Sequence, residues 1–149
     1  MARFFDIDDA NAVLPELREI LATLRDERTQ LIALRDEFAR ETTPGRGSSA
    51  GEEGAEPGAD APRDRAGTEE RRRLRLRMQG VIDQMQAGVA RIDELGVTLR
   101  EIETGLVDFP ALVSGRQVWL CWRLGEGDVE FWHELDSGFG GRRPLADLA

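Results

Sequence analysis

The chain has 149 residues, the length of a single domain, and 33% of them are charged. Its formal net charge of −9 argues against a protein that binds nucleic acid in general or an anionic membrane surface. The one Cys cannot form an internal disulfide and no apolar run reaches membrane-spanning length, so we expect a soluble, cytoplasmic, single-domain protein over residues 1–149.

An amphipathic first helix is predicted over residues 4–41. Asp6 is the expected N-cap, followed three residues later by Asp9, and acidic side chains favour the positive end of the helix dipole. Pro15 lacks an N–H and removes the bond to the Asn11 carbonyl, so we expect a kink or a fresh helix start there. Apolar residues then recur at helical spacing: Leu17, Ile20, Leu21, Leu24, Leu31, Leu34 and Phe38.

Residues 42–67 have a different composition. They contain three prolines and no Val, Ile, Leu, Met or aromatic residue. Such a stretch cannot bury enough apolar surface to offset the entropy lost on ordering. We therefore predict a disordered connector.

A second helix is predicted over residues 68–106. Its apolar residues follow a heptad spacing: Leu74, Met78, Val81, Met85, Gly88, Ile92, Leu95, Leu99, Ile102 and Leu106. Gly80 is interpreted as a tolerated weak point, whereas Gly88 lies on the seam and favours close approach of another backbone or of the sheet. Two apolar seams joined by a connector indicate an antiparallel two-helix hairpin of coiled-coil type.

Residues 107–145 are predicted to form a small β-hairpin cap and a glycine-rich tail. The runs 118–124 and 129–135 are rich in β-branched and aromatic residues and flank a glycine-containing loop. A two-residue turn and a four-residue loop at 125–128 give the same register. Residues 107–110 precede or include a proline, are expected to be extended, and could form a third strand.

The expected hairpin register assigns each side chain to one of two faces. It pairs Leu120 with His133 and Cys121 with Trp132, and side chains alternate along each strand. The helix-facing set is then Val118, Leu120, Trp122, Leu124, Val129, Phe131, His133 and Leu135. On the outer face, Arg123 is expected to pair with Glu130. This face and the tail also carry exposed aromatic residues that predict an interaction surface: Trp119, Trp132 and Phe139.

Candidate chemical sites lie in this C-terminal segment. Because the register places Cys121 and His133 on opposite faces, we expect neither a metal site nor a Cys nucleophile served by His133. A lone His on an apolar face is more typical of a core residue bonded to a carbonyl or carboxylate than of a tuned acid or base. Residues 138–143, with two arginines after three glycines, could instead bind an anion, although a flexible loop with paired arginines is favoured. The candidate ligand-binding residues are Arg116, Arg123, Glu126, His133, Asp136 and Arg142.

Three stretches carry a family resemblance: FFDIDDANAVLPEL (4–17), ELGVTLREIETGLVDFPA (94–111) and GRQVWLCWRLGEGDVEFWHELDSGFGGRRPL (115–145). With its Cys-Trp-Arg-Leu-Gly-Glu, Trp-His and Gly-Phe-x-Gly-Arg strings, the chain resembles a bacterial family catalogued as domain of unknown function number 2203. The resemblance implies motif positions and no activity. These positions are Arg116, Cys121, Trp122, Arg123, Gly125, Glu126, Trp132, His133, Gly138, Phe139 and Arg142.

The sequence therefore predicts an α+β protein, mainly α, in which an antiparallel two-helix hairpin is capped by a small antiparallel β-hairpin. We favour a non-enzymatic interaction or scaffold module that forms a homodimer or binds a protein partner, without a cofactor, nucleic acid or membrane. The alternative is a small enzyme or an anion- or small-ligand-binding protein with its site on the β-hairpin and the glycine-rich tail.

Overall fold

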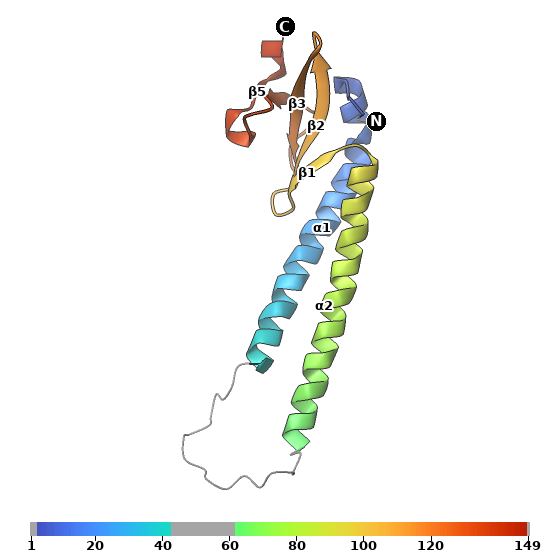
Figure 1. Cartoon of the computed structure of the whole chain (residues 1–149), viewed down its shortest axis with the longest axis vertical. Helices are drawn as coiled ribbons and strands as arrows, with labels where there is room; N and C mark the ends of the chain where they lie inside the picture. The colour runs from blue at the N-terminus through green and yellow to red at the C-terminus, as the bar shows by residue number, and fades with distance from the viewer. Residues whose placement is uncertain (1–2, 43–61, 149) are drawn as a thin grey trace. The chain divides into compact units, whose positions relative to one another are not determined.

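The computed structural model describes residues 3–42 and 62–148, which form two helices followed by a five-stranded antiparallel sheet (Figure 1). The α+β class with mainly helical content is thereby confirmed. The chain divides into two compact units, one comprising Met1–Arg28 and Gln84–Ala149 and the other Thr29–Asp83. Most of the predicted connector, residues 43–61, lies outside the described residues.

Helix α1 (Ile7–Thr42) begins with the predicted N-cap. The Asp9 backbone N–H donates to Asp6 Oδ1 at 2.7 Å, and the Asp6 N–H donates back to Asp9 Oδ2 at 3.4 Å, as in a capping box. The helix continues through Pro15, so the prediction of a fresh start there is wrong. Leu14 and Leu17 are fully buried on either side of Pro15, and their packing offsets the lost backbone bond.

Helix α2 (Pro62–Glu94) starts earlier and ends earlier than the predicted range 68–106. A proline is tolerated at its start because the first N–H groups of a helix have no intrahelical partner. The chain leaves the helix just before Gly96, which has a φ of +81°. The Val97 N–H donates to the Ile92 carbonyl at 3.2 Å and the Gly96 N–H to the Asp93 carbonyl at 2.9 Å, the pattern of a Schellman motif.

Within the first unit, the parts of α1 and α2 that it contains contact each other and run antiparallel. Arg91 Nε donates to Glu16 Oε1 at 2.6 Å, and a Cβ atom added at Gly88 would lie 3.1 Å from Leu24 Cδ2. Gly88 therefore allows close approach of α1, as its place on the seam suggested. Within the second unit, Leu34 and Leu74 are buried and the Arg75 guanidinium lies 5.7 Å from the centre of the Phe38 ring. No helix in the described part of the chain is long and apolar enough to cross a membrane.

The sheet belongs to the first unit and runs in the order β1-β2-β3-β4-β5, with every neighbouring pair antiparallel. Its strands are β1 (Thr98–Glu101), β2 (Leu106–Val113), β3 (Arg116–Arg123), β4 (Phe131–His133) and β5 (Arg143–Pro144). The possible third strand at 107–110 is confirmed as part of β2. Strand β1 occupies residues that were assigned to the second helix, and it edges the sheet beside β2 (Figure 1).

The register between β3 and β4 differs from the predicted one by a single residue. Trp119 pairs with His133, Leu120 with Trp132 and Cys121 with Phe131. A one-residue shift moves every side chain of a strand to the opposite face. The predicted faces are therefore right for β3 and wrong for β4, which places Trp132 on the helix-facing side and His133 on the outer side. The predicted pairing of Arg123 with Glu130 does not occur, because β4 begins only at Phe131.

The loop 124–130 explains the shift. Its backbone leaves the ladder and binds α1, because the Val129 N–H donates to Asn11 Oδ1 at 2.7 Å and Arg18 Nη2 donates to the Gly127 carbonyl at 3.2 Å. Trp122 Nε1 donates to the same carbonyl at 2.8 Å, and the Val129 side chain is buried in the core. Packing against α1, rather than a short turn, therefore decides where β4 rejoins the sheet.

The inner face of the sheet is the face that packs on the helices. Its buried side chains join those of α1 and α2 in one hydrophobic core. Phe5 enters the same core and meets Phe109 edge to face, with ring centres 5.2 Å apart. The inner-face members are Val107, Phe109, Ala111, Val118, Leu120, Trp122 and Trp132.

Candidate functional site

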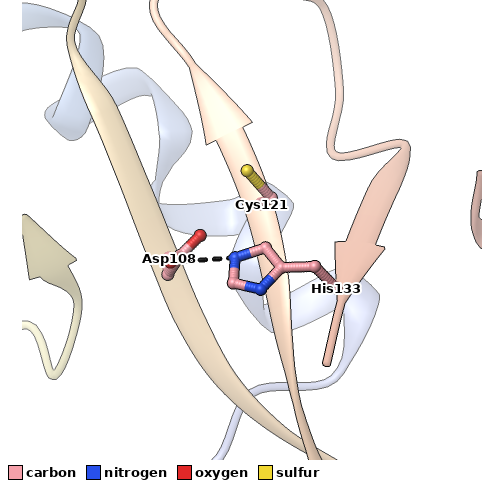
Figure 2. A group of neighbouring side chains, drawn as sticks. All are labelled: Asp108, Cys121 and His133. Carbon is pink, nitrogen blue, oxygen red and sulfur yellow. Dashed lines mark ion pairs between the residues drawn. The ribbon is translucent and has the colours of Figure 1, made fainter. Parts of the chain in front are cut away.

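The outer face of the sheet buries three side chains that can bind metals or protons. Asp108 on β2 pairs with Cys121 on β3, which pairs with Phe131 on β4, and His133 lies two residues beyond Phe131 on the same face. Figure 2 shows the three side chains as neighbours on adjacent strands, with Asp108 and His133 facing each other. Their exposed fractions are 2% for Asp108, 1% for Cys121 and 2% for His133. The expectation that Cys121 and His133 lie on opposite faces is wrong, because it depended on the shifted register.

We call these residues the polar cluster: Asp108, Cys121 and His133. One ligand atom from each, the carboxylate oxygen, the thiol sulfur and a ring nitrogen, lies within 4.8 Å of the other two. The sequence also allows an all-carboxylate metal set of Asp108, Glu134 and Asp136, but these three do not form such a group among the described residues. A signal for the role of Asp108 was present in the sequence, since it is the one charged residue inside the apolar run of β2.

His133 is oriented by a backbone carbonyl. Its Nδ1 lies 2.8 Å from the Glu134 carbonyl oxygen, and this oxygen can only accept, so Nδ1 carries the hydrogen. Its Nε2 lies 3.0 Å from Asp108 Oδ2 (Figure 2). This approach is close but outside hydrogen-bond geometry, and Nε2 is buried without a hydrogen bond to the described residues. The expected carbonyl and carboxylate neighbours are thus present, on the opposite face from the predicted one.

Asp108 is held on one side by an arginine that sequence reasoning missed. Arg100 Nε donates to Asp108 Oδ2 at 2.8 Å, while Asp108 Oδ1 is buried and makes no hydrogen bond to the described residues. The Arg100 guanidinium also lies 4.8 Å from the centre of the Trp119 ring. Arg100 was overlooked because residues 98–101 were assigned to the second helix, where they would have been far from the hairpin.

Cys121 is a protonated thiol in this environment. Burial raises its pKa to about 12, the Asp108 carboxylate adds to the rise, and the Arg142 side chain opposes it. A thiol is a nucleophile only as the thiolate. Nucleophilic catalysis by Cys121 is therefore not supported in the metal-free protein.

A pocket of about 330 Å³ opens over two members of the polar cluster. Asp108 and His133 contribute to its lining, and Arg100 and the tail residue Phe139 contribute other walls. We call this cavity the outer-face pocket, and its lining is Arg100, Leu106, Asp108, His133, Leu135, Asp136, Ser137, Gly138 and Phe139. It combines apolar walls with a few converging polar groups, as ligand-binding pockets commonly do.

The remaining predicted ligand residues divide into pairs. Arg142 Nη1 donates to Glu126 Oε1 at 2.9 Å and Arg142 Nη2 donates to Glu126 Oε2, in a bidentate pair. Arg142 also lies over the Phe131 and Phe139 rings, 3.9 and 4.2 Å from their centres. Arg123 uses its backbone N–H to bond Glu126 Oε1 at 2.7 Å. Arg142 and Glu126 thus satisfy each other and brace the tail against the sheet.

Arg116 lies apart from the outer-face pocket. Its Nη1 donates to both carboxylate oxygens of Glu134, at 2.7 and 2.5 Å, and this pair is solvent-exposed. Of the six candidate ligand residues, the outer-face pocket brings together His133 and Asp136. The proposed interaction face is likewise divided, because Trp132 is buried on the inner face whereas Trp119 and Phe139 are not.

Fold and site together define a small α+β protein, mainly helical, whose antiparallel sheet buries an Asp–Cys–His cluster beneath a pocket. The chain belongs to the family DUF2203, described as an uncharacterized conserved protein, whose model matches residues 3–145. This confirms the resemblance found in the sequence. Neither the curated proteins nor the solved structures contain a significant match to the chain.

Proposed function

We propose that the protein binds a small molecule with an anionic group in the outer-face pocket. The observation that carries the proposal is the buried Asp108–His133 contact at a cavity of about 330 Å³ that Arg100 also lines. Cavities of roughly this size are at the lower end of the range that holds small ligands. The ligand is therefore a small metabolite rather than a polymer.

Arg100 is the group that selects an anion. It uses Nε for Asp108, and a guanidinium carries four further N–H donors in a planar fork. That fork matches the geometry of carboxylate and phosphate groups. Leu106, Leu135 and Phe139 supply apolar contact for the rest of the ligand.

A thermal-shift screen with small carboxylates and phosphates tests this proposal. A ligand that binds only the native state raises the melting temperature by mass action. We expect Arg100→Gln to abolish the shift produced by a hit. Arg116→Gln is the matched control, because Arg116 is an exposed arginine of β3 outside this pocket. A panel without any hit, or equal losses in both variants, would contradict the proposal.

An interaction module built from the helices is the second candidate. We propose that α1 and α2 form a coiled-coil-like hairpin that pairs with a second copy of the chain. Leu76 of α2 favours this candidate, because 64% of this large apolar side chain is exposed and a second copy of the chain could cover it. Sedimentation velocity at high micromolar concentration should show a dimer that Leu76→Glu dissociates, and a monomeric wild type would exclude it.

A further inference from the structure

The hydrogen-bond pattern of His133 leaves two buried polar atoms, one on His133 and one on Asp108, without a hydrogen-bond partner among the described residues. In a neutral imidazole whose Nδ1–H donates to the Glu134 carbonyl, Nε2 has a lone pair and no hydrogen, and Nε2 lies 3.0 Å from an oxygen of the Asp108 carboxylate. Two acceptors then face each other, and Nε2 and Asp108 Oδ1 are both buried without a hydrogen bond to the described residues. Leaving such groups unsatisfied is costly, and a cation between them would satisfy both.

We infer that the polar cluster is a binding site for a divalent transition metal, zinc by its ligand chemistry, held by His133 Nε2, Cys121 Sγ and an Asp108 carboxylate oxygen. A thiolate, an imidazole and a carboxylate are the ligands that zinc takes in proteins. Metal-binding histidines almost always donate their other ring N–H to a carbonyl or carboxylate, as His133 does to Glu134.

The spacing of the three ligand atoms fits one ion. Zinc bonds of this type put neighbouring ligand atoms of a tetrahedral site roughly 3.3–3.6 Å apart. The three atoms here lie within 4.8 Å of one another, so small side-chain rotations bring them onto one ion. They come from three adjacent strands of one sheet, which holds their backbones in place (Figure 2).

The charges around the site are compatible with a bound cation. A zinc ion with one thiolate and one carboxylate ligand has no net charge, because the two anionic ligands offset the ion. Arg142 is neutralised by its bidentate pair with Glu126. Arg100 binds Asp108 Oδ2 from outside and leaves Oδ1 available to the ion, which is the usual role of a residue that orients a metal ligand.

Three protein ligands leave a tetrahedral ion with one open position, as in catalytic rather than structural zinc sites. Asp108 and His133 also line the outer-face pocket, so this position faces the pocket. The inference deepens the proposed function, and it rests on that function for the fourth ligand: the anionic group of the bound molecule completes the metal's coordination.

Titration of the untagged, metal-free chain of residues 1–149 with Co²⁺, a spectroscopic substitute for zinc, tests the inference. We expect saturation by a single ion per chain, the near-ultraviolet charge-transfer band of a Co²⁺–thiolate bond, visible bands of tetrahedral Co²⁺, and displacement by Zn²⁺. The chain contains one Cys and one His, so no other thiol or imidazole can produce these signals.

Variants separate the site from nonspecific binding by an acidic chain. Cys121→Ser should remove the charge-transfer band, and His133→Gln should weaken Co²⁺ affinity more than about tenfold. Glu130→Gln is the matched control, since Glu130 is an exposed carboxylate outside both the pocket and the polar cluster and its replacement should leave both signals unchanged. Circular dichroism of each metal-free variant establishes that it is folded.

A folded wild type that shows no charge-transfer band, or a band that survives Cys121→Ser, would overturn the metal site. The proposed function is scored separately by repeating the thermal-shift screen with and without added Zn²⁺. Hits that bind equally in both conditions and require Arg100 would keep the small-ligand function and reject the claim that the ligand completes the metal's coordination. Metal binding without any small-molecule hit would reject the small-ligand function and leave the site in place.

Discussion

On the inner face of the sheet, Trp122 and Phe109 are fully buried against the helices, whereas the buried side chains of the outer face include Asp108 and His133. The two faces thus reach the same depth with opposite chemistry. Inner-face groups are apolar, or satisfied like Trp122 Nε1, while the outer face keeps two buried polar atoms without a hydrogen bond to the described residues. Burial alone therefore does not identify a hydrophobic core. Buried groups that are apolar or hydrogen-bonded stabilise the fold, whereas buried polar atoms without a hydrogen bond indicate a functional site.

Truncation of the inner face should give the largest loss of stability. Trp122→Ala removes a fully buried ring together with the hydrogen bond to the Gly127 carbonyl, and we expect the free energy of unfolding to fall by about 3–5 kcal/mol. Trp122→Phe is the control that keeps most of the ring and should lose clearly less. Chemical denaturation measures both, and a loss below about 1 kcal/mol for the alanine variant would show that the inner face is not the stabilising one.

Breaking the ion pair between Glu126 and Arg142 should cause an intermediate loss of stability that depends on pH. Burial raises the pKa of Glu126, but the hydrogen bonds from Arg142 and from the Arg123 backbone outweigh it, so the pKa is lowered on folding. The unfolded chain then binds more protons, and this stability is present above the unfolded value and is lost as the pH falls through the folded value.

Glu126→Gln should cost roughly 1–3 kcal/mol at pH 7 and flatten the loss of stability below about pH 5. Urea denaturation at a series of pH values measures this. Glu130→Gln, an exposed acid of the same loop, is the control and should keep the wild-type pH profile. Identical profiles for wild type and Glu126→Gln would contradict the assignment.

The rim of the outer-face pocket should give the smallest effect on stability. Asp136 is exposed and makes no ion pair or hydrogen bond among the interactions of the described residues, so Asp136→Asn should change the free energy of unfolding by less than about 0.5 kcal/mol. The same denaturation measurements test this expectation. A loss comparable to that of Glu126→Gln would show that the rim is part of the structural framework.

Local sequence patterns were sufficient to predict the structure of segments whose conformation is set by residues close by in the chain. The capping box of Asp6 and Asp9, the apolar stripe of α1 and the inner-face residues of β3 all follow from short-range patterns. The end of α2 was misjudged, since Leu99, Ile102 and Leu106 continue the heptad spacing by coincidence while lying in β1, the following turn and β2. Gly96 ends the helix with a positive φ, but it lies inside the predicted range 68–106, where the continuing heptad spacing hid this signal.

The polar cluster could not be derived in the same way. It requires the register of β4, and that register depends on where the loop 124–130 rejoins the sheet. The contacts that decide this are non-local: Val129 bonds Asn11, and Gly127 accepts from Arg18. Periodicity within the hairpin gives no information on such contacts.

The loop 124–130 therefore determines which face of the sheet each side chain of β4 occupies. A change of one residue that β4 takes up by slipping one position against β3 would exchange the faces of Trp132 and His133, carrying the indole onto the outer face and the imidazole into the apolar core. Surface loops ordinarily tolerate insertions and deletions of any small size. Here the site is preserved only by changes that leave β4 in its present register, and Asn11, on a helix far away in the chain, helps to hold that register by binding Val129.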